Sequence, residues 1–250
     1  MSGHSKWSTI RRKKEKIDAQ RGKVFTKIIK ELTIAARRGG GDESSNPALR
    51  TAIASAKAAN MPAANIDRAI KKGTGELPGV SYEEVTYEGY GPGGTALLIE
   101  ALTDNKNRTV AEIRHILSRY NGNLGESGCV AWMFAKKGII SINKNDIGEE
   151  QLLELVLDAG ADDLRSEEET FEVVTSPSNF ENVRRTLENH QIKIEEADLT
   201  MHAHNTINVR GKDAENLIRI MDALEDHDDV NSIYSNFEID EEELQRIEQS

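Results

Sequence analysis

The spacing of apolar residues in this sequence changes at the glycine-containing stretch 73–79, and this change restricts the folds open to the chain. Before that stretch, apolar residues recur every three or four positions, which is the spacing of helices that bury one face. After it, short apolar runs bounded by turn residues predict strands, with helical segments between them. A length of 250 residues, 37% of them apolar, suits two or three small domains. We therefore predict an α+β fold, with an N-terminal helical domain followed by two α/β domains.

The segment 1–79 is predicted to form a basic helical domain. Its first clear helix spans 21–38, where the apolar residues recur at helical spacing. Asn46 is expected to cap a second helix that starts with Pro47, and a third helix is expected to end at a left-handed Gly73. The basic residues of the first helix are expected on its outer face: Lys23, Lys27, Lys30 and Arg37.

The remainder of the chain is predicted to hold two α/β domains, the third domain being inserted into the second. The order strand, helix, strand, strand, helix, strand over 136–202 is that of a ferredoxin-like βαββαβ unit. Strands at 206–209 and 231–237 are expected to return to the strands that precede the insertion. The preceding strands are expected at 82–88, 95–103 and 130–134, and the inserted unit is expected to open with a strand at 139–142. The predicted domains are 1–79 (helical), 80–135 with 203–240 (discontinuous α/β), 136–202 (inserted) and 241–250 (a loose acidic tail).

Charge is divided unevenly along the chain, although the net charge of -11 alone argues against a nucleic-acid partner. Residues 1–80 carry 17 Lys and Arg against 7 Asp and Glu, whereas residues 81–250 carry 15 against 36. Phosphate attraction depends on charge within a Debye length of about 8 Å, so a distant acidic body weakens it little. The sequence therefore predicts a basic head on an acidic body.

Several features exclude membrane and secreted classes of protein. No stretch approaches the ~18 consecutive apolar residues of a membrane-spanning helix. The charged start lacks the apolar segment of a secretory signal, and Ser2 occupies the position where myristoylation requires glycine. Cys129 is the single cysteine, so neither an internal disulfide nor a Cys-x-x-Cys site can form. We expect a cytoplasmic protein without a membrane partner.

The basic segment 1–16 carries most of the functional argument. It has too few regularly spaced apolar residues to fold by itself, so its cations can replace counterions on phosphates, and Trp7 can stack on an exposed base. The alternative is a solvated charge run with Trp7 packed against the helical domain. No helix combines Asn, Gln and Arg as a base-reading helix does, which favours contacts to backbone and shape. The residues predicted to bind nucleic acid are Lys6, Trp7, Arg11, Arg12, Lys13, Lys14, Lys16, Arg21, Lys23, Lys27, Lys30, Arg37 and Arg38.

Two motifs resemble enzyme motifs, but their contexts indicate structural roles. Gly89–Gly94 matches the G-x-G-x-x-G dinucleotide pattern, which needs a helix directly after the glycines, whereas 95–102 has the pattern of a strand. It therefore predicts a hairpin loop, and an alanine at Gly91 would disturb that loop if Gly91 has a positive φ. Cys129 is expected to start an apolar strand as a small buried hydrophobe, since no histidine partners it. We predict no catalytic residue, no cofactor and no small-molecule substrate.

Three further groups of polar residues are not predicted to form a metal site or a catalytic site. His202 and His204 would share one face of a strand, but no third ligand is indicated, so surface histidines near a domain junction are expected. The acidic groups lack EF-hand spacing and are expected in solvated turns: Glu167, Glu168, Glu169, Asp226, Asp228 and Asp229. Four cations after the second strand form either a second phosphate contact or a plain exposed face: Arg108, Arg114, His115 and Arg119.

A set of local motifs is spread over the chain. The motifs are Gly3-His4-Ser5-Lys6-Trp7, Lys23-Val24-Phe25-Thr26-Lys27, Asn46-Pro47-x-Leu49-Arg50, Asn60-Met61-Pro62, Tyr87-Glu88-Gly89-Tyr90-Gly91-Pro92-Gly93-Gly94 and Thr103-Asp104-Asn105-x-Asn107-Arg108-Thr109. Together they are similar to the motifs of the YebC family, also called YebC/PmpR, and the resemblance covers the chain to about residue 240. In one departure, Cys129 stands where the family more often has serine.

The resemblance implies three domains, the third inserted into the second, and a role in gene expression. Bacterial members are described as DNA-binding transcriptional regulators, and the related mitochondrial protein is a translational activator for cytochrome c oxidase subunit I. Members are also linked to the ribosome, which makes a translation factor that binds ribosomal RNA the principal alternative. An enzyme and an adaptor that binds proteins through its acidic domains are further hypotheses. The expected partner is nucleic acid, either DNA or RNA.

Overall fold

The computed structural model describes residues 20–167 and 169–248 and has an α+β fold, as predicted. These residues form two compact units. The smaller unit spans 132–205, and the larger unit contains 20–131 and 206–248. No helix in the described ranges is both long and apolar enough to cross a membrane.

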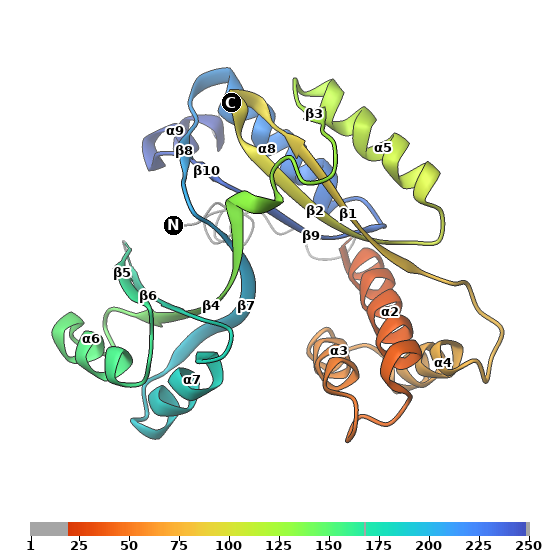
Figure 1. Ribbon diagram of the computed structural model, residues 1–250, viewed down its shortest axis with the longest axis horizontal. Coiled ribbons are helices and arrows are strands. Elements are labelled where there is room, and N and C mark those ends of the chain that lie inside the picture. The colour runs from red at the N-terminus through yellow and green to blue at the C-terminus, as the bar shows by residue number, and fades with distance from the viewer. Residues whose placement is uncertain (1–19, 168, 249–250) are drawn as a thin grey trace. The chain divides into compact units, whose positions relative to one another are not determined.

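Three helices form the N-terminal part of the larger unit (Figure 1): α2 (Gln20–Gly39), α3 (Pro47–Ala58) and α4 (Ala63–Thr74). Asn46 caps α3 as predicted, because its side-chain oxygen accepts a hydrogen bond from the Leu49 N–H at 3.1 Å. Its amide nitrogen also donates to the Ala35 carbonyl at 2.8 Å, which ties α3 to α2. The three helices enclose a cluster of apolar residues that includes Leu32 and Leu49.

The third helix ends later than the sequence pattern predicts. The left-handed cap is Gly75, with φ 85°, and not Gly73. Gly73 lies inside α4, where a Cβ would stand 2.4 Å from the carbonyl oxygen of Thr33. Glycine is therefore required at position 73 because it allows α4 to approach α2 closely.

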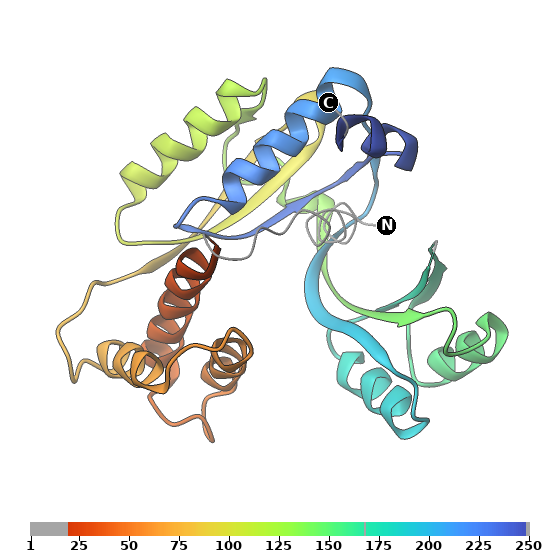
Figure 2. The same ribbon diagram turned by 180° about the vertical axis from the view of Figure 1, so that it is seen from behind.

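A four-stranded sheet forms the second part of the larger unit. Its strands are β1 (Glu83–Tyr90), β2 (Ala96–Thr103), β3 (Asn123–Leu124) and β9 (Val230–Ser235), in the order β3-β1-β2-β9. One face is covered by α5 (Lys106–Arg119) and α8 (Gly211–Glu225), as Figures 1 and 2 show. The antiparallel pairing of β2 with β9 confirms that the C-terminal segment returns to the strands before the insertion.

The glycine-rich segment after β1 is a hairpin loop. Tyr90 pairs with Ala96, and the turn Pro92–Gly94 leads directly into β2. The hairpin prediction is confirmed, but Gly91 has φ -90° and not a positive φ. A Cβ at Gly91 would instead lie 2.6 Å from the Thr95 hydroxyl oxygen and 2.9 Å from Leu217 Cδ1. Close packing therefore explains the glycine at this position.

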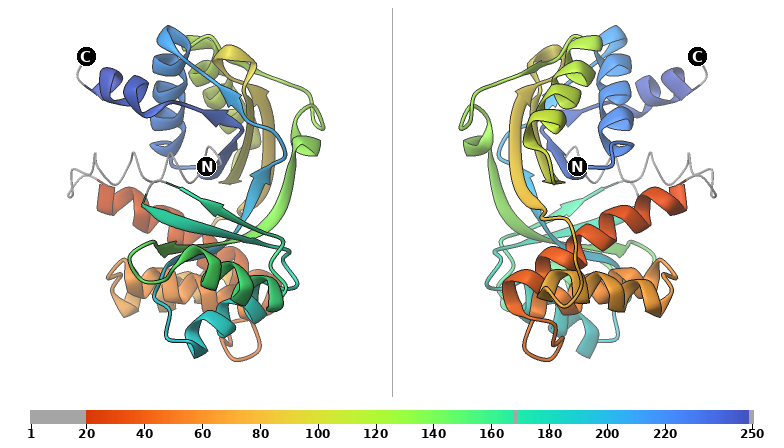
Figure 3. Two further views of the ribbon diagram at one scale, coloured as in Figure 1. Left: turned by 90° about the vertical axis from the view of Figure 1, so that its left-hand side faces the viewer. Right: turned by 90° about the vertical axis from the view of Figure 1, so that its right-hand side faces the viewer.

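The smaller unit is a ferredoxin-like βαββαβ unit, as predicted. Its sheet has the antiparallel order β5-β6-β4-β7, and the two helices and the sheet share one apolar cluster. Both helices lie on the same side of this sheet (Figure 3). The elements are β4 (Phe134–Asn143), α6 (Glu149–Asp158), β5 (Asp163–Ser166), β6 (Thr170–Thr175), α7 (Phe180–Asn189) and β7 (Ile194–Ala203).

Two predictions around this unit are wrong. The expected strands at 130–134 and 139–142 are replaced by a single strand, β4, preceded by the 3-10 turn Ala131–Met133. Strand β4 is continuous because it pairs with β7 from Phe134 to Ile142, beyond its pairing with β6, which starts at Gly138. Cys129 accordingly lies in a turn and does not start a strand.

Residues 241–248 of the acidic C-terminal segment form a helix, contrary to the expected loose tail. After the short parallel pair β8 (Ile207–Asn208) and β10 (Phe237–Glu238), residues Glu241–Glu248 form the helix α9. Leu244 and Ile247 pack against the core of the larger unit. The Glu243 carboxylate accepts a hydrogen bond from the Gly211 N–H at 2.6 Å.

Candidate nucleic-acid interface

The predicted nucleic-acid residues fall into two groups according to what the structure describes. Seven residues of the N-terminal segment lie outside the described residues, and so does the side chain of Arg21: Lys6, Trp7, Arg11, Arg12, Lys13, Lys14 and Lys16. The other five are on α2: Lys23, Lys27, Lys30, Arg37 and Arg38.

The first half of α2 faces the end of α8. Lys23 lies 3.2 Å from the Asp226 carboxylate, and Lys27 donates a 2.7 Å hydrogen bond to the carbonyl oxygen of Glu225. The last carbonyl groups of a helix carry partial negative charge, so cations are favourable at this position. These two lysines therefore contribute to holding α2 against the second part of the unit.

Lys30 is buried, so the prediction that it belongs to an exposed basic face is wrong. Its ammonium group lies 2.5 Å from Asp229 Oδ1 and donates to the carbonyl oxygens of Leu102 and Asp228. It also lies 5.6 Å from the centre of the Tyr82 ring. Because only 6% of Lys30 is exposed, this residue cannot reach a phosphate group without leaving its site.

Asp229 is the centre of this buried polar cluster, contrary to the expectation of a solvated turn. Its second carboxylate oxygen accepts hydrogen bonds from Arg108 and Thr109, both at 2.7 Å, and from Thr103 at 3.3 Å. Burial by itself would raise the pKa of Asp229, but the bonds from Lys30, Arg108 and Thr109 outweigh it and hold that pKa well below its usual range. Asp229 therefore joins α2, α5 and the start of β9.

The end of α2 carries two accessible arginines. Arg37 donates hydrogen bonds to the Ser81 hydroxyl and to the Tyr82 carbonyl oxygen. Arg38 forms a 2.9 Å ion pair with Glu84, and its side chain is 65% exposed. Exposed pairs of this kind contribute about 0–1 kcal/mol, so a phosphate group can compete for the arginine.

Cations of α3 and α4, which are not among the predicted binding residues, are also accessible. Lys57, Arg68 and Lys72 are exposed, and within 20–167 and 169–248 no carboxylate lies within 4.0 Å of their charged groups. Arg50 is exposed as well and donates to the backbone carbonyls of Glu43 and Ser44. Arg50, Arg68 and Lys72 occupy positions between the buried residues of their helices, and Lys57 directly follows the last buried residue of α3. This pattern could have identified them.

The four residues predicted to form either a second phosphate contact or an exposed face lie on α5, and they differ in whether they have partners. Arg108 is engaged with Asp104 and Asp229. Arg114, His115 and Arg119 are exposed, and Arg119 lies 5.4 Å from the centre of the Tyr120 ring. Only these last three cations are available for a partner.

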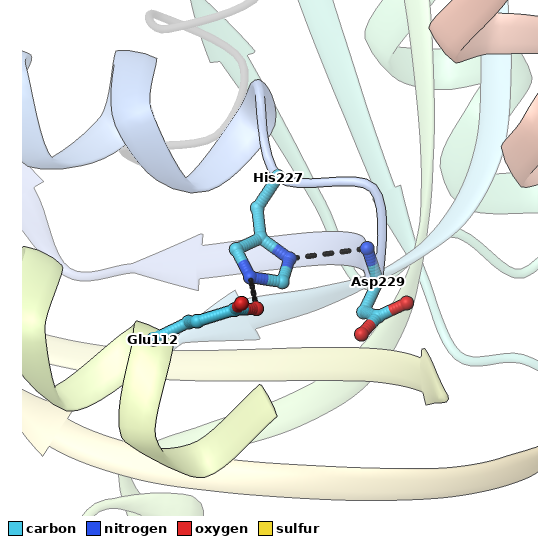
Figure 4. A group of neighbouring side chains, drawn as sticks. All are labelled: Glu112, His227 and Asp229. Carbon is cyan, nitrogen blue, oxygen red and sulfur yellow. Dashed lines mark hydrogen bonds and ion pairs between the residues drawn. The ribbon is translucent and has the colours of Figure 1, made fainter. Parts of the chain in front are cut away.

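A group formed by Glu112, His227 and Asp229 has the composition of a metal site (Figure 4). However, His227 Nδ1 accepts a hydrogen bond from the Asp229 N–H at 3.1 Å, so Nε2 is the protonated nitrogen and donates to Glu112 at 2.9 Å. Both ring nitrogens are thus engaged, and the Asp229 carboxylate already binds two cations. The group fits a hydrogen-bonded turn and does not fit a metal ion.

The remaining titratable candidates do not have the surroundings of catalytic groups. His202 is buried, so the prediction of a surface histidine is wrong for this residue. Burial, together with Arg165, lowers the pKa of His202 to about 4, and the two side chains are 2.9 Å apart. The buried Glu88 carboxylate accepts hydrogen bonds from the backbone of the turn that holds Cys129. Burial and this carboxylate raise the pKa of the Cys129 thiol, which is the opposite of what activates a nucleophile.

Comparisons with known proteins cover nearly the whole chain. The family description "TACO1/YebC protein N-terminal domain" matches residues 5–76, and "TACO1/YebC second and third domain" matches residues 82–237. A probable transcriptional regulatory protein from Geobacter sulfurreducens is 57% identical over 99% of this chain and 100% of its own length. One from Syntrophobacter fumaroxidans is 58% identical with the same coverage. The crystal structure of a conserved hypothetical protein from Aquifex aeolicus is similar, with a TM-score of 0.76 and 47% identity, over 90% of this chain and 93% of that one.

Proposed function

The chain belongs to the TACO1/YebC family, and on that premise we propose that it is a non-enzymatic regulator of gene expression that binds nucleic acid through its N-terminal helical domain. The names of its relatives, probable transcriptional regulatory proteins, support the regulatory part of this proposal. These names favour transcription as the process, and we infer from transcription that the target is DNA.

One observation carries the nucleic-acid part of the proposal: the helical domain has cations that no carboxylate of the described residues neutralises. Lys57, Arg68 and Lys72 are exposed without an acidic partner in the described ranges, and Arg38 is held by a weak surface pair. The sequence before Gln20 adds six more lysines and arginines against two acidic residues. Binding of nucleic acid to such a surface is favourable because the cations release counterions that are condensed on the phosphates.

A translation factor that binds structured RNA is the second candidate, and the packing of α2 favours it. A recognition helix must present one free face to the major groove of a duplex. Helix α2 instead places its apolar side against α3 and α4 and its lysines Lys23, Lys27 and Lys30 against the second part of the unit. The accessible cations are therefore suited to backbone and shape, which is how proteins bind double-stranded RNA.

The proposal is tested by the salt dependence of binding to a mixed DNA duplex and to a structured RNA. Replacing Arg11, Arg12, Lys13 and Lys14 by Ala should weaken binding to all sequences alike. Each lost contact to a duplex phosphate should reduce the slope of log K against log salt by about 0.9. A second variant, with alanine at Lys57, Arg68 and Lys72, should also have a smaller slope.

The matched control removes three exposed cations from the smaller unit: Lys136, Arg185 and Lys193. It should bind with the same affinity and slope as the unaltered protein. If the control and the helical-domain variants lose the same affinity, net charge and not the helical domain governs binding, and the proposal is wrong.

A further inference from the structure

A cavity of about 660 Å³ lies within the larger unit, between the helices α2 and α3 and the strands β1 and β2. Small-molecule sites usually have volumes of about 300–1,000 Å³, so this cavity is large enough for a ligand. It contains none of the exposed cations of α3 and α4 proposed to bind nucleic acid, Lys57, Arg68 and Lys72. It shares Arg38 with the accessible end of α2, and it shares Leu102 with the Asp229 cluster.

The lining of the cavity combines apolar surface with an excess of negative charge. Side chains such as Ile34, Ala52 and Leu102 provide the apolar part. Its charged residues are Glu31, Glu84, Glu100 and Arg38, and Arg38 already pairs with Glu84. The lining therefore has a formal charge of -2, contributed by Glu31 and Glu100.

The strand register places two of the carboxylates on one face of the sheet. Glu84 is opposite Leu102, and Thr86 is opposite Glu100, so Glu84 and Glu100 are diagonal neighbours on β1 and β2. Diagonal neighbours in an antiparallel pair are about 7–8 Å apart. The Arg38–Glu84 pair therefore lies beside Glu100, whereas Glu31 comes from α2, so the two carboxylates that carry the excess charge belong to different elements of the cavity lining.

Within the described residues, Glu31 and Glu100 form no ion pair, and their hydrogen-bond partners are neutral. The Glu31 carboxylate is hydrogen-bonded to the side chain of Asn231. Burial raises the pKa of Glu31, and this effect exceeds the opposite effects of Asn231 and Lys27. Glu100 accepts a 3.2 Å hydrogen bond from the Tyr234 hydroxyl. Burial and the Glu100 charge raise the pKa of Tyr234 to about 12, so the phenol remains a donor. Both carboxylates would gain from a cation that enters the cavity.

We propose that this cavity is a binding site for a linear aliphatic polyamine. Its ammonium groups would pair with Glu31 and Glu100, and its methylene chain would cover the apolar side chains between them. A small hydrated metal ion would leave that apolar surface exposed, because hard cations bind oxygen ligands and water. A flexible diamine or triamine satisfies both kinds of surface.

The test is calorimetric titration of the full-length protein with spermidine. The unaltered protein should bind one equivalent, and the double variant Glu31→Gln with Glu100→Gln should bind at least tenfold more weakly. Because a chain of net charge -11 attracts any polycation, the control removes the same charge elsewhere, by Glu150→Gln with Glu154→Gln on the exposed side of α6. The control should retain the affinity of the unaltered protein.

A second variant tests the cavity without changing its charge. Thr51 lines the cavity and is exposed, so Thr51→Trp should fill the space and abolish spermidine binding while the protein stays folded. The proposal is overturned if the charge control weakens binding as much as the double variant, or if Thr51→Trp binds spermidine normally. It is also overturned if a synthetic peptide of residues 1–19 displaces spermidine at lower concentration, since the site would then bind a polypeptide cation. None of these titrations contains nucleic acid, so their outcome is independent of the proposed function.

Discussion

Asp229 receives side-chain hydrogen bonds from α2, from the end of β2 and from α5, although these elements are far apart in the sequence. Neither Lys30 nor Asp229 could be identified as buried from the sequence. A lysine between apolar positions on a helix normally faces solvent, and an aspartate among other acidic residues normally lies in a turn. Their burial depends on the register in which β9 pairs with β2, which no local pattern encodes.

The first prediction at the residue scale concerns this cluster. Asp229→Asn should destabilise the protein by about 3–5 kcal/mol, because it leaves Lys30 buried without a compensating charge. Asp226→Asn, which removes an exposed partner of Lys23, should cost less than about 1 kcal/mol. Urea unfolding measures both values. Equal decreases in the free energy of unfolding for the two variants would contradict the argument that the buried cluster stabilises the protein more than an exposed ion pair does.

The second prediction concerns pH. The unfolded chain protonates His202 near its ordinary pKa of 6.5, whereas the folded protein resists protonation until about 4, because of burial and Arg165. The unfolded state therefore binds more protons in this interval, so stability should fall as pH decreases from 6.5 to 4. Melting temperatures at pH 7 and pH 5 should differ more for the unaltered protein than for His202→Gln. His190→Gln, at an exposed histidine, should behave as the unaltered protein does.

At the scale of elements, two local signals were confirmed, whereas the helix cap predicted at Gly73 is wrong. Among the features that depend on distant pairing, the return of β9 to β2 was predicted, but the length of β4 was not. The pattern Asn46-Pro47 is sufficient to place the start of α3, and the glycines after Tyr90 are sufficient to indicate a hairpin. The length of β4 is set by its partner β7, so the sequence around Gly138 suggests a break that the structure does not have. Helix α9 could not be predicted from the sequence, because it has few apolar residues, such as Leu244, and it is stabilised by packing these residues on a core that other segments form.

The prediction at this scale is that Gly91→Ala destabilises the hairpin by about 1–3 kcal/mol through overpacking against Thr95 and Leu217. Strain from a positive φ does not contribute, since φ is -90°. Gly22→Ala in α2 is the control, because a Cβ there meets nothing within 4 Å. It should be neutral or slightly stabilising. Thermal unfolding of both variants measures the difference, and equal melting temperatures would contradict the packing argument.

At the scale of the whole molecule, the uneven distribution of charge is the feature that links sequence to proposed function. The sequence identifies the basic head, but it cannot separate the cations that bind a partner from those that hold the fold. The structure makes that distinction for α2, where Lys30 is buried while Arg38 remains accessible. It also adds Lys57, Arg68 and Lys72 as candidates for phosphate contacts.

The most direct test of nucleic-acid binding by the helical domain is ultraviolet crosslinking in the native cell. Attached DNA and RNA are sequenced in separate pools, and the crosslinked peptides are identified by mass spectrometry. We expect crosslinked peptides from residues 1–79, with promoter DNA supporting a transcriptional regulator and ribosomal RNA supporting a translation factor. Crosslinks confined to residues 80–250, or none above background, would contradict the account.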